Sequence, residues 1–469
     1  MPISQARTIA FEVLRRVEAE GAYASDVLHA ELGPRVASDN AALATEITLG
    51  VLRWRRLLDF LLDRQLKKPV AQLDLPVAIA LRMGLYQLRF LERIPARAAV
   101  NESVELVKRA RKSSAASLVN AVLRRASDEN PQAPTAANAD RVERLIPTDF
   151  PLADRLGILH SHPTWLVERW LKNFGQASTL ALLEANNRAP NLSCAIHDPA
   201  QSDDVFAALK KAGLRIEPGQ FLRSAFVASG GSPARSDSFR RGLISIQDEA
   251  SQTVPLLLGV QSRETVLDLC AAPGGKTPPL VRAAGSQGMV VATDRHAHRL
   301  RAMRNQFKRL GVDSVQIVEL NAAEGLPFGR QFDRILVDAP CSGTGTLARH
   351  PEIRWRLRPE QLFEFHQLQL GILASAIRQL APGGRLVYST CSMEPEENED
   401  VVSEALASAP AIKQVARDEV AKLLAPHLVT GLDARNLSDA NGQFRTSPAV
   451  QRTDGFFAAV LEKAGATRP

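Results

Sequence analysis

The chain has 469 residues, of which 45% are hydrophobic and 23% charged, as in soluble globular proteins, and this length predicts about three domains. No run is long and apolar enough to span a bilayer, and the start, Met-Pro-Ile-Ser-Gln-Ala-Arg, lacks an apolar signal core, so we expect a cytoplasmic protein without a membrane partner. The formal net charge of +7 favours a polyanionic partner.

The positions of the charged residues and cysteines indicate where a polyanion would bind and which cysteine sites are absent. Residues 1–130 contain 20 Lys and Arg against 15 Asp and Glu, whereas the remainder contains 38 against 36, so most of the excess lies at the front. The four cysteines have no CxxC spacing and no histidine partner, which predicts free thiols and neither a metal site nor a disulfide framework.

Residues 1–128 predict a helical bundle. Apolar side chains recur at helical spacing in the segments 6–19, 40–58, 75–91 and 99–110. Basic residues cluster at Arg53, Arg55 and Arg56, at 108–112, and at Arg124 and Arg125. These clusters form either solvated faces or a surface that contacts phosphates.

Residues 129–149 are rich in Ala, Pro and Asn and lose their period, so we interpret them as a linker. Residues 150–240 alternate helical and strand-like stretches and predict a small α/β module of the RRM-like kind. Residues 241–465 show βαβ periodicity, which predicts a parallel sheet covered on both faces. The expected strands are 266–269, 289–293, 315–320, 334–337 and 385–389.

The turn after the first of these strands predicts a cofactor site. Cys270, Ala271 and Ala272 are followed by Pro273, Gly274, Gly275 and Lys276. Glycines let the backbone approach a ligand, and a helix beginning near Thr277 would point unpaired N–H groups at the same place. The spacing fits neither G-x-G-x-x-G nor a Walker loop, so a nucleotide-like cofactor and a structural turn both remain open.

Three motifs in order resemble the Nol/Nop/Sun family of RNA cytosine-5 methyltransferases. They are Asp-Leu-Cys-Ala-Ala-Pro-Gly-Gly-Lys-Thr at 268–277, Asp-Ala-Pro-Cys-Ser-Gly-Thr-Gly at 338–345 and Ser-Thr-Cys-Ser at 389–392. The resemblance implies a Rossmann-like methyltransferase domain that ends in an antiparallel strand, for which 455–461 is the candidate. It also implies that the turn 270–276 holds S-adenosylmethionine.

The front of the chain, including 98–106 and 119–125, resembles the NusB-like RNA-binding domain of Sun-type enzymes that act on small-subunit ribosomal RNA. This resemblance implies ribosomal RNA as the partner, before full subunit assembly, and we expect a monomer. Two alternatives stay open. One is a transfer RNA cytosine-5 methyltransferase; the other is a catalytically silent RNA-binding or antitermination factor, which the presence of both strand-end cysteines disfavours.

The resemblance assigns further cofactor contacts. Asp294, at the end of the second strand, would bind the ribose, although it could instead cap the following helix. Asn321 stands where family members usually carry an aspartate near the adenine, and its amide can both donate and accept. Asp338 completes the expected cofactor set.

Catalysis at carbon-5 of cytosine needs a thiolate that first adds to carbon-6. Cys341 and Cys391 each follow a strand, whereas Cys194 and Cys270 are interpreted as small buried hydrophobes. By resemblance Cys391 is the nucleophile and Cys341 serves product release, with the swapped assignment as the alternative.

Four further features accompany the cysteines. We expect Asp338 to bind the cytosine edge, or else to cap its strand. Lys276 is expected to orient Asp338 or to stabilise the thiolate, or else to be a solvated loop lysine. Arg354 is expected to reach an RNA phosphate. The acidic run 394–400 is interpreted as a solvated helix start.

Overall fold

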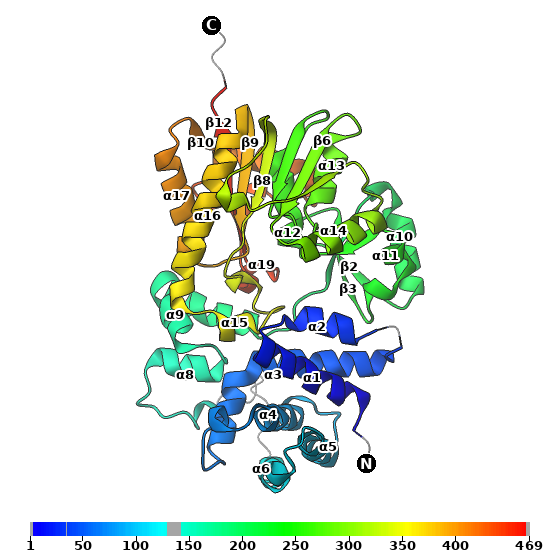
Figure 1. Cartoon of the computed structure of the whole chain (residues 1–469), viewed down its shortest axis with the longest axis vertical. Coiled ribbons are helices and arrows are strands. Elements are labelled where there is room, and N and C mark those ends of the chain that lie inside the picture. Colours follow the sequence, from blue (N-terminus) through cyan, green and yellow to red (C-terminus); the bar gives the residue numbers. More distant parts are fainter. Residues whose placement is uncertain (1–2, 34, 129–141, 466–469) are drawn as a thin grey trace. The chain divides into compact units, whose positions relative to one another are not determined.

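The computed structural model describes residues 3–33, 35–128 and 142–465 (Figure 1). Contacts divide the chain into two compact units. The first consists of Met1–Ala189 and Leu347–Leu357, and the second of Pro190–Thr346 and Arg358–Pro469. A short segment from the second half of the sequence therefore belongs to the first unit. No described helix is long and apolar enough to cross a membrane.

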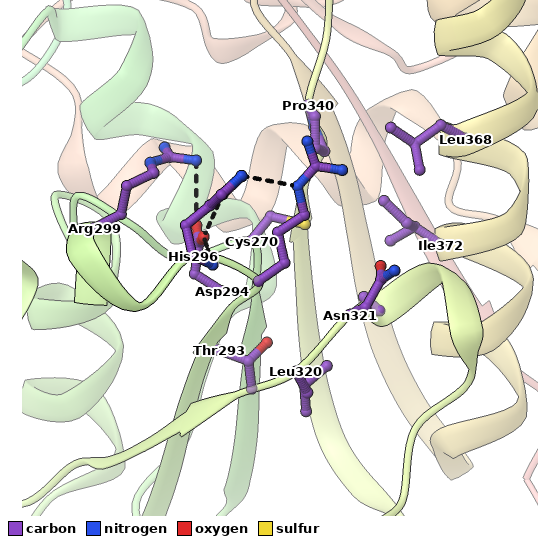
Figure 2. Close-up of a pocket in the computed structure, with 12 residues that line it drawn as sticks. Cys270, Thr293, Asp294, His296, Arg299, Leu320, Asn321, Pro340, Leu368 and Ile372 are labelled. Atoms are coloured by element: carbon purple, nitrogen blue, oxygen red, sulfur yellow. Dashed lines mark hydrogen bonds and ion pairs between the residues drawn. The ribbon is translucent and has the colours of Figure 1, made fainter.

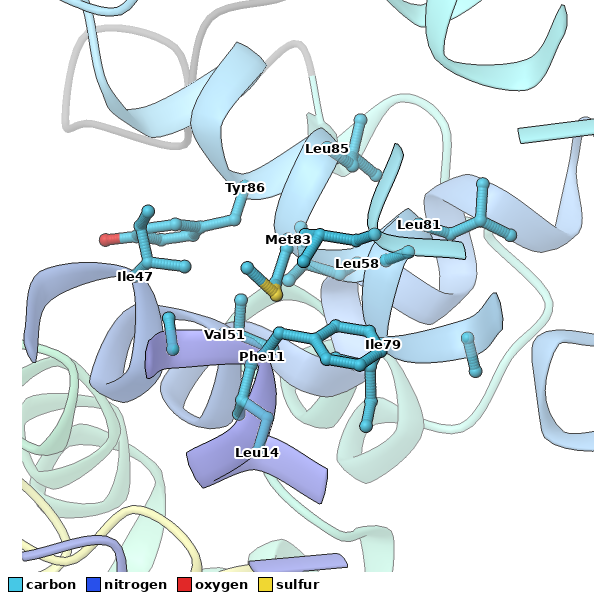
Figure 3. Close-up of a cluster of buried hydrophobic side chains, with 14 of the residues drawn as sticks. Phe11, Leu14, Ile47, Val51, Leu58, Ile79, Leu81, Met83, Leu85 and Tyr86 are labelled. Atoms are coloured by element: carbon cyan, nitrogen blue, oxygen red, sulfur yellow. The ribbon is translucent and has the colours of Figure 1, made fainter. Parts of the chain in front are cut away.

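Helices make up the first unit, as predicted. They are α1 (Gln5–Glu20), α2 (Ala24–Glu31), α3 (Ser38–Asp63), α4 (Leu75–Phe90), α5 (Ala96–Arg109) and α6 (Ala116–Asp128). Their apolar faces meet in one core that contains Leu14, Ile47, Val51 and Met83 (Figure 3). Helix α4 packs on α1, α3, α5 and α6, so it is apolar around most of its circumference.

Two more helices, α8 (Leu152–Leu159) and α9 (Thr164–Asn186), also belong to the first unit. Val142 and Ile146 pack with Leu57 and Ile158 in a small cluster beside α3. The division by contacts at Ala189 differs from the predicted start of the small module at residue 150, because helical period alone does not show which core a helix joins. Residues 129–141 of the predicted linker lie outside the described residues.

The segment Leu347–Leu357, which contains α15 (Ile353–Arg356), is built into the first unit. The fully buried Arg354 guanidinium donates to the carbonyl oxygens of Ser161 at 3.0 Å and Asn186 at 3.1 Å. The indole Nε1 of Trp355 donates to the Leu52 carbonyl oxygen at 2.6 Å. The prediction that Arg354 reaches an RNA phosphate is therefore wrong, because the side chain is fully buried and its two terminal nitrogens donate to internal acceptors.

In the second unit a four-stranded antiparallel sheet has the order β2-β3-β1-β4. Its strands are β1 (Ser193–Ile196), β2 (Arg215–Pro218), β3 (Ala225–Ser229) and β4 (Ile244–Ile246). Val205 and Leu209 of α10 (Ser202–Lys211) pack with Cys194 and Phe226 of the sheet. The predicted small α/β module is confirmed.

The second unit also contains an eight-stranded sheet, in the order β10-β12-β9-β8-β5-β6-β7, with β11 paired to β12. The parallel strands are β5 (Thr265–Leu269), β6 (Met289–Asp294), β7 (Gln316–Glu319), β8 (Phe332–Asp338) and β9 (Leu380–Thr390). The predicted antiparallel last strand is β12 (Phe456–Lys463), with β10 (Ile412–Gln414) and β11 (Phe444–Thr446) beside it.

The connections of this sheet fix where a ligand can bind. Helices α13 (Thr277–Ala284), α14 (Ala297–Leu310) and α16 (Pro359–Gln379) are crossover connections. The chain runs outward from β5 to β6 and β7, then returns to β8 on the other side of β5. The strand order therefore reverses at β5 and β8, and ligands of such sheets bind in the crevice at the carboxyl ends of those strands.

Candidate active site

The glycine turn joins β5 to α13 and packs closely against α14. Gly274 has a φ of 94°, and a Cβ atom there would lie 2.6 Å from Met303 and 2.8 Å from Phe307. Only glycine suits this position, because the conformation is left-handed and the space is filled. Pro278 and Pro279 stand in the first turn of α13, where their missing N–H groups have no helical partner to lose.

A hollow opens at the carboxyl ends of β5 and β6 (Figure 2). Asp294, almost fully buried, accepts from the His296 backbone N–H at 2.9 Å and lies 3.3 Å from the Arg299 guanidinium. Figure 2 shows Leu368 and Ile372 of α16 on the side of the hollow away from Arg299. Asp294 thus accepts a hydrogen bond from the residue that precedes α14, and it also lines the hollow.

Asn321 and Cys270 line the same hollow. The Asn321 side chain donates to the Glu324 carboxylate at 2.7 Å and accepts from the Ala323 N–H at 3.2 Å. Burial raises the pKa of the Cys270 thiol to about 12, so this cysteine keeps its proton. The structure therefore brings together three of the residues that the sequence analysis assigned to the cofactor.

Two buried polar atoms in this region have no hydrogen-bond partner among the described residues: Asp268 Oδ1 and Thr293 Oγ1. Burial raises the pKa of Asp268 to about 7, although Thr277 Oγ1 donates to its other oxygen at 2.7 Å. Unpaired buried acceptors are costly unless a ligand supplies donors. S-adenosylmethionine carries an ammonium group, hydroxyl groups and a positive sulfonium. Thr293 and the Asp294 carboxylate line the first hollow and can accept from such groups, so the residues present fit this cofactor.

A second hollow, of about 200 Å³, adjoins the other side of the glycine turn. The turn contributes Ala271, Ala272, Pro273, Gly275 and Lys276, and the other lining residues are Ser245, Ile246, Gln247, Ser251, Gln306 and Asp338. Of the turn residues, the first hollow is lined by Cys270. The residues assigned to the cofactor by sequence thus divide between two hollows, a division that a linear motif does not reveal.

Asp338, the last residue of strand β8, forms an ion pair with Lys276. Asp338 Oδ2 accepts from Lys276 Nζ at 2.7 Å, and Asp338 Oδ1 accepts from Ser389 Oγ at 2.9 Å. The Lys276 ammonium also lies 5.1 Å from the ring centroid of Phe456, and its side chain is 12% exposed. Lys276 is therefore not a solvated loop lysine, since it holds the Asp338 carboxylate between β5 and β9.

The two strand-end cysteines lie side by side, with 3.3 Å between their Sγ atoms. Cys341 follows β8 and Cys391 follows β9, and these neighbouring parallel strands end at the same edge of the sheet. The hydrogen bond with Cys391, burial and the negative charge of Glu397 together raise the pKa of Cys341 well above its ordinary value. Cys341 therefore holds its proton at neutral pH.

The loops that contain Cys341 and Cys391, which follow β8 and β9 and are called the cysteine loops, are also hydrogen-bonded to each other and to the loop before β12. The Gly345 N–H donates to the Cys391 carbonyl oxygen at 2.9 Å, and the Gly455 N–H donates to the Gly345 carbonyl oxygen at 2.8 Å. A Cβ atom on Gly345 would lie 2.2 Å from the Gly455 oxygen. This close backbone approach explains why glycine occupies position 345.

The acidic run 394–400 differs from its prediction as a solvated helix start. Glu394 and Glu397 are fully buried, and only Glu399 and Asp400 stand in the first turn of α17 (Glu399–Ser408). Glu397 reaches under both cysteine loops and accepts hydrogen bonds from both. The contacts of Glu397 could not be predicted from the sequence, because nothing in the spacing of the acidic residues distinguishes a buried member from a solvated one.

Comparisons with known proteins decide the family. Family models match for the NusB family over residues 4–128, for the ferredoxin-like domain of RsmF/B-like methyltransferases over 162–233, and for 16S rRNA methyltransferase RsmB/F over 255–462. The probable ribosomal RNA small subunit methyltransferase B of Bacillus subtilis strain 168 is 32% identical over 470 residues, which cover 99% of this chain and 100% of that protein. The chain belongs to the RsmB/F methyltransferase family.

A second relative and a solved structure agree with this family and fold. Ribosomal RNA small subunit methyltransferase B of Pseudomonas putida KT2440 is 33% identical over 438 residues, covering 92% of this chain and 93% of that protein. The crystal structure of PH0851 superposes with a TM-score of 0.79 at 25% identity, covering 99% of this chain and 100% of that one. The RsmB/F-family chain described here is an S-adenosylmethionine-dependent methyltransferase, and the predicted family, fold and cofactor are confirmed.

Proposed function

We propose that this chain methylates carbon-5 of a cytosine in 16S ribosomal RNA through a covalent bond between Cys391 Sγ and carbon-6 of the base. The observation that supports the proposal is the pair of thiols at the ends of β8 and β9, beside the Asp338–Lys276 ion pair. A thiol that adds to carbon-6 makes carbon-5 nucleophilic, which splits one difficult step into two.

The residues of the chain divide the work. The Cys391 thiolate adds to carbon-6, while the protonated Cys341 thiol donates a hydrogen bond to the Cys391 sulfur and stabilises its negative charge. Asp338, held by Lys276, faces the amino edge of the cytosine and selects it over uracil. S-adenosylmethionine supplies an electrophilic methyl group when bound. Water then takes the carbon-5 proton, the bond between carbon-6 and Cys391 Sγ breaks with its electron pair returning to the sulfur, and the aromatic ring is restored. The protonated Cys341 thiol assists release by donating a hydrogen bond to the departing sulfur.

For the cofactor, the proposal places the ribose at Asp294 and the adenine near Asn321. We expect Asp294→Ala to weaken S-adenosylmethionine binding by roughly 1–3 kcal/mol, because ribose hydroxyls would lose a buried acceptor. Isothermal titration calorimetry measures the change, with Asp313→Ala on an exposed loop as the control. Unchanged affinity in a folded Asp294→Ala protein would contradict the ribose assignment.

The basic clusters of the first unit fall into two groups. Arg53 donates to the Ala348 carbonyl oxygen at 3.0 Å, Arg55 lies 3.5 Å from Glu18, and Arg56 lies 2.9 Å from Asp154. These three arginines serve internal contacts, so we do not propose that they contact phosphates. Exposed basic residues remain on and between α5 and α6: Lys108, Arg109, Arg111, Arg124 and Arg125.

We propose that the exposed group on α5 and α6 contacts RNA phosphates. Replacing Arg124 and Arg125 by Ala should weaken RNA binding and make its salt dependence flatter. The magnitude of the negative slope of log affinity against log salt should fall by roughly 2, about one for each lost phosphate contact. Filter binding across a salt series measures the slope. The control is Lys413→Ala with Lys422→Ala, which removes the same charge from the second unit. Equal slopes in all three proteins would show that the group is only a solvated face.

Bisulfite sequencing of cellular RNA, with and without the gene, tests the reaction and the target together. The expected result is one cytosine of 16S ribosomal RNA whose protection from conversion disappears with the gene. Loss of protection in a transfer RNA instead would favour the transfer RNA alternative. Cofactor binding by the purified protein without transfer of labelled methyl to any RNA would favour the silent RNA-binding factor.

A further inference from the structure

A buried carboxylate lies directly beneath the two cysteine loops. Glu397 is fully buried and has four hydrogen-bond donors around its two oxygens. The Ser342 backbone N–H and the Gln369 amide donate to Oε1 at 2.8 and 3.0 Å. The hydroxyls of Ser342 and Ser392 both donate to Oε2, the latter at 2.5 Å. No lysine or arginine of the described residues pairs with this carboxylate.

Each partner of Glu397 adjoins a cysteine. Ser342 follows Cys341, and Ser392 follows Cys391. Gln369 of α16 also fixes the loop that contains Cys341, because its amide donates both to Glu397 and to the Pro340 carbonyl oxygen, the latter at 2.8 Å. One carboxylate therefore fixes the residue after each cysteine.

The next residue, Asn398, holds the second loop on both sides of Cys391. Its Oδ1 accepts from Thr390 Oγ1 at 2.5 Å, and its Nδ2 donates to the Ser392 carbonyl oxygen at 2.9 Å. The Tyr388 hydroxyl donates to the Glu397 carbonyl oxygen at 2.6 Å, which anchors the pair to β9. These bonds hold the Glu397 side chain in one place under both loops.

We propose that Glu397 is a positioning residue, which sets the relative placement of Cys391 and Cys341 and so couples the attack step to the release step. The proposal rests on the proposed function above. Glu397 itself lies beneath the loops and acts through Ser342 and Ser392. A carboxylate suits this role because it can accept four hydrogen bonds at once, which neither an amide nor a hydroxyl can do. Misplacement of a reacting group by about 1 Å can cost about 100-fold in rate.

Single-turnover reactions on a denaturing gel test the proposal, with the rate at which the linked protein–RNA species forms and the rate at which it disappears measured separately. Ser392→Ala should slow formation at least about 10-fold, and Ser342→Ala should slow disappearance by a similar factor while formation continues. Glu397→Ala should slow both steps about 100-fold with cofactor affinity within about 2-fold of wild type. Glu397→Gln, which keeps the length and one acceptor, should recover part of the loss.

The control is Glu399→Gln, at the start of α17 two residues after Glu397. This change alters the ion pair between Glu399 and Arg445 of β11 and should leave both rates unchanged. Should Glu397→Ala fail to fold, the two serine variants still decide. The proposal is overturned if both serine variants change the two rates in equal proportion, or if none of the variants changes either rate. A wild-type enzyme that never forms a linked species would instead overturn the proposed covalent function, so the two failures are distinguishable.

Discussion

Replacing Cys391 by Ala should reduce methyl transfer by about 10⁴-fold or more and abolish the linked protein–RNA species, because the proposed mechanism assigns the addition to carbon-6 to this thiol. Replacing Cys341 by Ala should have a different effect. The neighbouring thiol at 3.3 Å still adds and the base is still methylated, but the linked species accumulates because release fails. Labelled methyl from S-adenosylmethionine, followed on a denaturing gel, separates the two outcomes.

The matched control is Cys194→Ala, in the core of the four-stranded sheet, which should retain both methylation and release. The reverse pattern, with the linked species lost in Cys341→Ala and trapped in Cys391→Ala, would make Cys341 the nucleophile.

Much of the fold could be predicted because its period is regular. Strands β5, β6 and β8 are short, largely apolar runs, and β6 and β8 end at an aspartate. A strand-end residue of a parallel sheet lies at the ligand edge. The same logic placed Asp294, Asp338 and the two cysteines at one edge. Their positions could be predicted because the local hydrophobic pattern marks where each strand ends and the alternation of strands and helices indicates a parallel sheet.

The residues that sequence analysis misplaced are charged residues that turned out to be buried. Arg53, Arg354 and Glu397 carry side chains that are rarely buried without partners, so exposure is the reasonable expectation for each. Their partners are mostly backbone atoms and small polar side chains far away in sequence, such as Ala348 for Arg53 and Ser342 for Glu397. No local period encodes such contacts, because tertiary packing alone creates them.

Arg354→Ala should destabilise the first unit by roughly 3–5 kcal/mol, because several buried acceptors would lose their donors together. Besides Ser161 and Asn186, the guanidinium donates to the Asn187 side-chain oxygen at 3.0 Å and to the Leu347 carbonyl oxygen at 3.3 Å. Removing the side chain also leaves a cavity, since Arg354 is among the largest fully buried residues.

Urea denaturation followed by circular dichroism measures the loss, and Arg358→Ala, at an exposed position just outside the segment, is the control. Arg354→Lys should fall between them, because one ammonium with three donors cannot reach every acceptor that the guanidinium serves. The effect should appear in helical signal rather than in cofactor affinity, since the segment belongs to the first unit. If Arg354→Ala unfolds at the same urea concentration as Arg358→Ala, the segment 347–357 contributes no stability to the helical unit, and its burial there has another purpose.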